Sequence, residues 1–329
     1  MQAELVIMEK LMLLSVEALH IPDGFLSIGV SILAWIISVS MVGYALRRVG
    51  QDLGERQVPM MGVLAAAIFA GQMLNFAVAG GTSGHLMGAA LATILMGPWA
   101  AILIMTSVVS IQALIFQDGG LLVLGANIFN MAIVGVAAAY MVYRTVLKIS
   151  GEKNKGILVS GFSAAWISIL LAALSVALQL AVSGTSPARL AIPAMAGVHA
   201  LIGIGEGLIT AGALAFILSV RPDLISQNKS NLAESRFVWV VGFLLAVALV
   251  IAAPLASTRP DGLEMVAMQV GFIGQARAPL FEIIPDYLIP GMANESLATI
   301  MAGLLGILIV FGVGIGVAYN RRKGNNPGR

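Results

Sequence analysis

The stretch HIPDGFLSIGVSILAWIISVSMVGYALRR, residues 20–48, decides the fold class. It joins a polar turn to an apolar run, residues 26–46, that contains no charged side chain and ends at two arginines. A helix rises 1.5 Å per residue, so about 20 apolar residues cross a hydrocarbon layer of about 30 Å. The stretch therefore predicts a membrane-spanning helix with a histidine, His20, at its mouth.

The composition of the whole chain agrees with this reading. Of the 329 residues, 59% are hydrophobic and 10% are charged, whereas soluble domains contain about 25% charged residues. We expect an all-α fold, a polytopic integral membrane helix bundle in contact with the lipid bilayer, in which many of the 37 glycines allow close helix packing. The net charge of +2 gives no reason to expect a nucleic-acid partner. The absence of cysteine excludes disulfides and thiolate metal sites.

The apolar runs predict about seven core spans and two C-terminal spans. The core spans are 26–46, 59–78, 85–96, 99–116, 121–142, 157–182 and 190–220, and the C-terminal spans are 238–256 and 297–319. The third span is short, and Gly97-Pro98 separates it from the fourth, because proline removes a helix donor and restricts the preceding residue. These two runs predict a tight helical hairpin or a partly re-entrant pair.

Basic residues follow the first, fifth, seventh and last spans. Short cytoplasmic loops are enriched in Lys and Arg, and even numbers of spans separate the four basic groups, so all four can be cytoplasmic. The predicted location is the cell (inner) membrane, with the C-terminus in the cytoplasm. His20, His85 and the loop 258–296 then lie at the outer face.

His20 and His85 are candidate metal ligands, since neutral imidazole is the commonest protein ligand for metals. His85 ends the segment GGTSGH, residues 80–85, whose glycines do not suit an ordinary helix. Non-helical backbone at membrane depth is tolerated where it lines a cavity or is buried in protein. The pair predicts a metal or small-ligand site. The alternatives are a simple interfacial turn and two histidines with structural hydrogen bonds.

His199 lies inside a predicted span, and Glu206 follows seven residues later on nearly the same helix face. Ionisable residues inside a membrane point to function because they are costly to bury. A structural pair that bonds neighbouring helices along a glycine-rich face is slightly favoured over metal ligation. The residues assigned to the surroundings or pathway of the site are Asn75, Thr82, Ser83, Asn127, His199 and Glu206. Gln117, Asp118 and Asn130 either line its approach or bond helix to helix.

The sequence shows no nucleotide-binding GxxxxGK[ST] motif, no HExxH motif and no recognisable catalytic set. We therefore expect no enzymatic activity of its own. Active transport would draw on a partner or on an ion gradient.

Four segments resemble, in order and spacing, the CbiM/NikM family over residues 20–220. They are HIPDGFLS, GGTSGHLMGAALA, FQDGGLLVLGANIFNMA and HALIGIGEGLIT. Members of that family are the substrate-capture (S) components of energy-coupling-factor (ECF) importers for cobalt and nickel. STRPDGLE at 257–264 and PDYLIPG at 285–291 resemble the small CbiN/NikN-type PDGLE subunit, here fused to the core. The resemblance implies a membrane coupling (T) subunit and cytoplasmic ATPase subunits as partners.

The resemblance also divides the chain into four parts. These are a leader, 1–18, that is cleaved if processing occurs, a metal-capture domain, 19–220, a cytoplasmic linker, 221–236, and a PDGLE domain, 237–329, with two spans and one outer loop. We expect the outer loop to help load the ion, because it is the only large outer segment on the face that carries the two histidines.

The ligands implied by the resemblance are four nitrogens in a roughly square-planar set. They are the terminal amine of Leu19, the backbone nitrogen and ring of His20, and the ring of His85. Tetragonal nitrogen coordination suits Ni(II). The sequence departs from the family pattern, because His20 is not the second residue and Leu19 replaces methionine. Cleavage after Ala18 would free the amine, since VEA at 16–18 has the small residues that signal peptidase reads, although the leader is a poor one; a misassigned start is the alternative. Without processing, a weaker or altered site is expected.

The leading interpretation is a substrate-binding subunit that captures Ni(2+) or Co(2+) as transported substrate, with nickel favoured. The first alternative is a secondary transporter driven by an ion gradient, which predicts inverted repeats that the sequence does not display. A membrane enzyme or metal sensor that uses His199 and Glu206 is the second, and it lacks a nucleophile or acid–base set.

Overall fold

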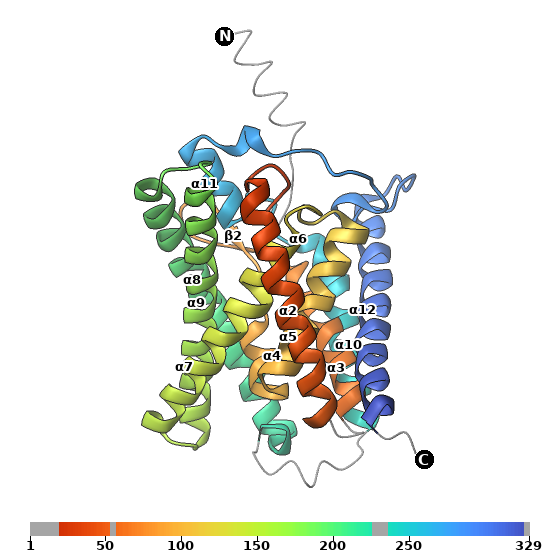
Figure 1. Ribbon diagram of the computed structural model, residues 1–329. Coiled ribbons are helices and arrows are strands. Elements are labelled where there is room, and N and C mark those ends of the chain that lie inside the picture. Colours follow the sequence, from red (N-terminus) through yellow and green to blue (C-terminus); the bar gives the residue numbers. More distant parts are fainter. Residues whose placement is uncertain (1–19, 53–56, 226–235, 326–329) are drawn as a thin grey trace.

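The computed structural model describes residues 20–52, 57–225 and 236–325, which form a bundle of helices running side by side (Figure 1). The first part of the chain contains α2 (Ile28–Asp52), α3 (Gln57–Gln72), α4 (Ala89–Met96), α5 (Pro98–Ile111), α6 (Leu124–Asn127), α7 (Gly135–Ser150), α8 (Asn154–Val182) and α9 (Ala188–Val220). The second part contains α10 (Arg236–Ala252), α11 (Gly262–Val270) and α12 (Glu295–Asn325).

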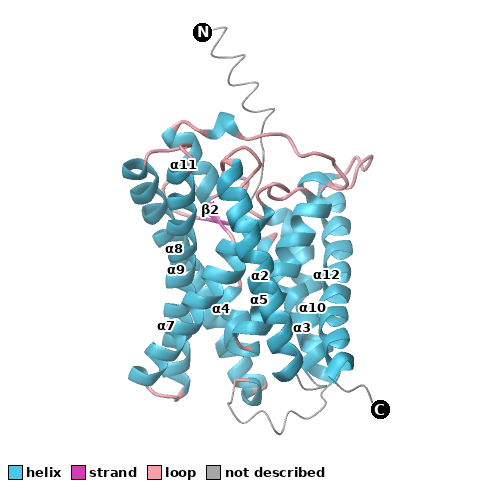
Figure 2. Cartoon of the chain, viewed as in Figure 1, coloured by secondary structure: helices cyan, strands magenta, loops and turns pink. Residues whose placement is uncertain are grey.

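Short elements complete the chain, and Figure 2 shows how little of it is strand. They are the π-helices η1 (Gln112–Phe116) and η2 (Ile128–Val134), the 3-10 turns η3 (Pro222–Leu224), η5 (Ala253–Leu255), η6 (Ile273–Gln275) and η7 (Pro285–Tyr287), and the strands β1 (Phe76–Ala77) and β2 (Ser83–Gly84). The prediction of an all-α polytopic membrane bundle is confirmed.

Six helices in the described residues are long and apolar enough to cross a membrane. They are Ile28–Val49, Pro98–Phe116, Leu124–Ser150, Asn154–Val182, Ala188–Val220 and Glu295–Val317. Val58–Gln72 and Trp239–Leu255 are shorter apolar helices. The structure therefore does not confirm the predicted count of seven core spans and two C-terminal ones.

Two predicted spans around the glycine-rich segment have the wrong bounds. Helix α3 ends at Gln72, so residues 73–78 are not helical, and α4 begins at Ala89 instead of His85. Between them β1 and β2 pair antiparallel, with Phe76 opposite Gly84. The helix cannot start at His85 because Gly88 stands at its N-cap with φ +82°, a left-handed conformation. The eight residues of α4 rise about 12 Å, too little to cross a membrane.

The C-terminal part packs against two edges of the core. Helices α10 and α12 pack on α3 at one edge of the bundle, whereas α11 packs on α9 at the other edge (Figure 1). The segment between α11 and α12 crosses the end of the bundle at which α2 begins and near which β2 lies (Figure 1). We call it the site end, because His20 precedes α2 and His85 follows β2 in the chain. The outer loop predicted over 258–296 is thus partly helical and is packed against the core.

Small residues bring α3 and α12 close together, as the glycine content predicts. A β-carbon on Gly314 would lie 3.0 Å from the Cα of Gly62, and a β-carbon on Gly306 would lie 2.2 Å from the Phe69 ring. Close approach of helix backbones is a main source of packing energy in a membrane, because lipid supplies no hydrophobic drive between helices. The C-terminal part is therefore joined to the core by direct backbone contact.

Replacing Gly314 by Leu is expected to weaken this contact. Overpacking typically costs about 1–3 kcal/mol, so the midpoint of thermal unfolding in detergent should fall. Gly312→Leu on the same helix is the matched control, since nothing lies within 4 Å of a β-carbon there. Equal melting of the two variants would contradict the assigned packing.

Candidate metal centre

His20 is the first described residue and is held by the turn that follows it. Gly120 N–H donates to the carbonyl of Ile21 (2.9 Å), and Asp23 Oδ1 accepts from the backbone N–H groups of Leu122 (2.9 Å) and Val123 (3.2 Å). The IPDG segment, residues 21–24, is a turn buried in the bundle, and the Asp23 carboxylate docks it onto the chain between η1 and α6.

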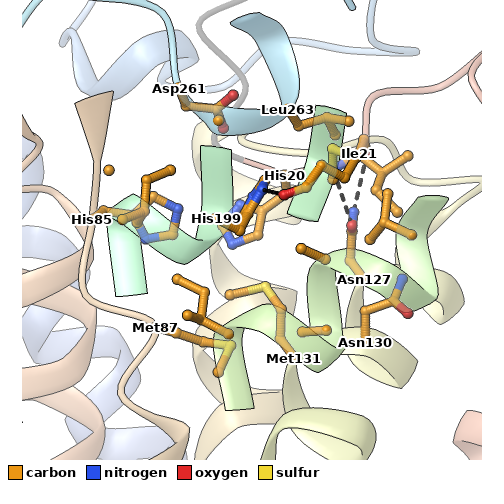
Figure 3. A pocket seen from close by; sticks show the side chains of 18 residues that line it. His20, Ile21, His85, Met87, Asn127, Asn130, Met131, His199, Asp261 and Leu263 are labelled. Atoms are coloured by element: carbon orange, nitrogen blue, oxygen red, sulfur yellow. Dashed lines mark hydrogen bonds between the residues drawn. The ribbon is translucent and has the colours of Figure 1, made fainter. Parts of the chain in front are cut away.

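Asn127 completes the clamp on this turn. Its Oδ1 accepts from Ile21 N–H (3.0 Å), and its Nδ2 donates to the Ile21 carbonyl (3.1 Å), the two bonds drawn in Figure 3. Asn127 therefore positions the residue after His20. Gly119 allows the close approach: its φ is +96°, and a β-carbon there would lie 2.8 Å from His20 Cβ.

His20 itself is buried against a carboxylate. Its Nδ1 lies 2.8 Å from Asp118 Oδ1, and the Tyr287 hydroxyl donates to Asp118 Oδ2 at 2.7 Å. When Nδ1–H is the donor, the neutral ring carries its lone pair on Nε2. That atom is buried and has no hydrogen-bond partner among the described residues. Carboxylate–histidine pairs of this kind orient metal ligands in proteins.

His85 faces His20, with 5.9 Å between the ring centroids and 52° between the ring planes. The Nδ1 of His85 lies 3.1 Å from the carbonyl of Leu86, which places the lone pair of the neutral ring on Nε2. The structure thus brings together two predicted ligands that are 65 positions apart in the sequence, from 20 to 85.

The two rings and His199 line one cavity of about 90 Å³ (Figure 3). His199 Nδ1 lies 2.9 Å from the Met195 carbonyl, and its Nε2 lies 2.9 Å from where a β-carbon on Gly262 would sit. His199 is therefore at the cavity wall, against the start of α11. Nothing in the sequence indicated that His199 lies near the site end.

Glu206 does not pair with His199. Its carboxylate is fully buried and accepts from the backbone N–H groups of Met87 (2.7 Å) and Gly88 (3.0 Å). Glu206 therefore holds the turn that follows His85, which is a structural contact with another segment, whereas the Nδ1 of His199 faces a carbonyl of its own helix. The glycine-rich face was recognised correctly, because β-carbons on Gly203 and Gly207 would meet Trp166 and Phe162 on α8.

Thr82, Ser83 and Asn75 contact the C-terminal part. Ser83 Oγ donates to the Arg259 carbonyl (2.7 Å), and its backbone N–H donates to the Pro260 carbonyl (2.8 Å). Thr82 Oγ1 also donates to Pro260 (3.1 Å), and the Asn75 carbonyl accepts from Ser257 N–H (2.8 Å). These residues attach the chain before Asp261 to the loop that carries His85.

Asn130 lies below the rings on η2 and bonds helix to helix. Its Oδ1 accepts from Ser175 Oγ and from Gln179 Nε2, both at 2.7 Å, and its Nδ2 donates to Gln179 Oε1 at 3.0 Å. Since Asn130 also lines the cavity, both alternatives left open by the sequence hold for it.

The charges at the site end favour an ion pair. Burial alone would lower the pKa of His20, but the charge of Asp118 and its hydrogen bond outweigh burial and raise it. Burial opposes ionisation of Asp118, yet His20 and the Tyr287 hydroxyl lower its pKa. Burial raises the pKa of Asp261 to about 6, despite its bond from Glu264 N–H. The Asp118 carboxylate therefore favours positive charge at the His20 ring.

The described side chains do not by themselves complete a metal site. Among them no three His, Asp or Glu residues are grouped closely enough to hold an ion. Further donors would have to come from the backbone, and Leu19, whose amine is one predicted ligand, lies outside the described residues. A chelate through the backbone nitrogen and ring of His20 would close through Nδ1, the atom that faces Asp118 here. The four-nitrogen set therefore stays a prediction.

Known families match both parts of the chain. A model described as the cobalt uptake substrate-specific transmembrane region, CbiM, matches residues 20–224, and a PDGLE domain model matches residues 236–323. A solved structure of a transition metal transporter is 31% identical, covers 69% of this chain and 99% of its own, and has a TM-score of 0.54.

Related proteins carry the names of metal transporters. The fused nickel transport protein NikMN of Archaeoglobus fulgidus is 37% identical over 92% of this chain and 99% of its own length. The fused nickel transport protein NikMN of Rhodobacter capsulatus is 29% identical over 93% of this chain and 100% of its own. The cobalt transport protein CbiM of Sorangium cellulosum is 32% identical over 64% of this chain and 95% of its own.

Glu206→Ala is expected to destabilise the protein and to release the turn after His85. It leaves two buried N–H groups without an acceptor, at about 1–3 kcal/mol each. Glu206→Gln keeps one acceptor oxygen, so its unfolding midpoint should lie between those of Glu206→Ala and wild type. Thermal unfolding in detergent measures this order, and an alanine variant as stable as wild type would refute the clamp.

Proposed function

The chain belongs to the CbiM family of cobalt-uptake transmembrane proteins and continues into a PDGLE domain, and on this basis we propose that it is the substrate-binding membrane subunit of an ATP-driven ECF importer. The transported substrate is nickel or cobalt, with nickel favoured. ATP hydrolysis takes place on separate ATPase subunits, which act through a membrane coupling subunit.

One observation carries the proposal. The rings of His20 and His85, from segments far apart in the sequence, face each other at 5.9 Å in a cavity of about 90 Å³. Borderline divalent ions such as nickel and cobalt bind imidazole well. The cavity suits a dehydrated ion better than an organic solute, since ligand pockets for small molecules are typically about 300–1,000 Å³.

The ligand assignment that we propose is the one implied by the family resemblance. His20 and His85 supply two imidazole nitrogens, and the backbone nitrogen of His20 and the amine of Leu19 complete the set when the chain is processed after Ala18. The remaining polar residues hold these donors: Asn127 fixes the turn after His20, and Glu206 fixes the turn after His85. The site lies on the outer face, from which the ion is captured.

Substitution of the two histidines tests the function. His20→Ala and His85→Ala should each abolish uptake of radioactive nickel and cobalt in cells that also produce the coupling and ATPase subunits. His199→Ala is the comparison, since its Nδ1 faces Met195 and its Nε2 faces Gly262, and it should retain most of the uptake. Uptake that continues without ATPase subunits would favour a gradient-driven carrier instead.

The terminal-amine ligand has a separate test. Intact mass and elemental analysis of the protein purified from its native membrane should show a chain that starts at Leu19 and carries one bound nickel or cobalt ion. A chain that starts at Met1 and still carries the ion would remove the amine of Leu19 from the ligand set. The two-histidine assignment would then rest on the substitutions alone.

A further inference from the structure

Asp261 brings a carboxylate to the cavity that the three histidines line. The cavity of about 90 Å³ is bordered by His20, His85 and His199, and Asp261 lies beside them (Figure 3). The histidines belong to the first part of the chain, whereas Asp261 belongs to the PDGLE sequence, residues 260–264, of the second part. Asp261 is only 5% exposed. The fused domain therefore places a buried acidic group next to the imidazole rings.

The residues on either side of Asp261 fix it in this place. The carbonyl of the preceding proline accepts from Ser83 N–H at 2.8 Å. A β-carbon on Gly262, the following residue, would lie 2.9 Å from His199 Nε2. Asp261 is thus held between the loop that contains β2 and helix α9, and its position depends on both.

The Asp261 side chain caps helix α11, but capping does not require its charge. Its Oδ1 accepts from Glu264 N–H at 2.6 Å. Asparagine caps helices about as well as aspartate, so a neutral side chain would serve here. A buried charge is costly unless it is paired, and no Lys or Arg among the described residues forms a salt bridge with Asp261. The charge therefore calls for a cation that the described residues do not supply.

The surroundings of Asp261 also favour a cation. Burial raises the pKa of Asp261 to about 6, and the charge of Asp118 contributes to this rise, whereas the Glu264 N–H and His20 oppose it. Since this pKa lies below neutral pH, most of the carboxylate is ionised there. A divalent cation in the cavity would be attracted by Asp261 and would offset the repulsion between the two carboxylates.

We propose that Asp261 provides a negative charge that attracts the divalent ion into the cavity and stabilises it there, without being one of the nitrogen ligands. The inference rests on the proposed function and adds to it a residue of the fused domain. It holds for either ring nitrogen of His20, because the carboxylate acts on the ion through its charge. The PDGLE domain thereby contributes to ion affinity as well as to the walls of the cavity.

The test is Asp261→Asn in the full-length chain in lipid nanodiscs, with Ni²⁺ and Co²⁺ affinity measured by competition with a chromophoric chelator. Binding should weaken about 10–100-fold, the range typical of groups that surround metal ligands. The midpoint of thermal unfolding without metal should not fall, since asparagine keeps the helix cap and removes a buried charge. The rise of this midpoint at a fixed Ni²⁺ concentration should be smaller than in wild type.

Glu264→Gln is the matched control. It removes the same charge from the first turn of the same helix, and Glu264 is not among the residues that line the cavity. This variant should therefore bind both ions as wild type does. The comparison separates a carboxylate inside the cavity from the overall charge of the PDGLE domain.

Four results would overturn the inference. Wild-type affinity in Asp261→Asn, while His85→Ala abolishes binding, would remove Asp261 from the site and leave the proposed function standing. Equal losses in Asp261→Asn and Glu264→Gln would assign the effect to the charge of the domain. A lower unfolding midpoint of metal-free Asp261→Asn would assign Asp261 a structural role. A wild-type chain that binds neither ion would overturn the proposed function as well.

Discussion

Polar groups buried in a bundle that crosses a membrane need partners within the protein, because no bulk water is there to satisfy them. Carboxylates meet this need at the site end. Asp23 accepts from the N–H groups of Leu122 and Val123, Asp118 pairs with His20 and Tyr287, and Glu206 accepts from Met87 and Gly88. Each carboxylate ties a site-bearing segment to a distant part of the chain, and the removal of any one would leave a buried polar group unpaired.

The second part of the chain is built into the same site. The residues before Asp261 bond to Thr82 and Ser83, Arg277 N–H donates to the Asp23 carbonyl at 2.8 Å, and Tyr287 reaches Asp118. The second part of the chain therefore contacts the loop that carries His85, the turn that follows His20 and the segment that carries Asp118. Because both parts belong to one chain, their association does not depend on protein concentration. The segment that crosses the site end is anchored by α10 and α12 at one edge of the bundle and by α11 at the other.

The fold and the outline of the site could be read from the sequence. Apolar runs predicted most helices because their length is set by the membrane, and the tandem glycines at 80–81 marked the break before His85. The pairing of His20 with His85 followed from placing both at one face. Helix ends were predicted less well, since α3 stops at Gln72 and α4 starts only after a left-handed Gly88. The start of α4 is fixed by Glu206 on α9, which accepts hydrogen bonds from the N–H groups of Met87 and Gly88. A contact with another helix cannot be read from the local sequence.

Composition and spacing by themselves determined that this protein is a helical membrane protein with two histidines beside its predicted spans, because those features depend on residue type and on the thickness of a bilayer. Only the tertiary structure decided the partners. His199 lies at the wall of the cavity. Glu206 accepts a hydrogen bond from the loop that follows His85, and the Tyr287 hydroxyl donates to Asp118, the partner of His20. Such contacts join residues far apart in the sequence, as the 169 positions between Asp118 and Tyr287 show. They depend on how helices rotate and pack against one another, which a linear pattern of apolar and polar residues does not specify.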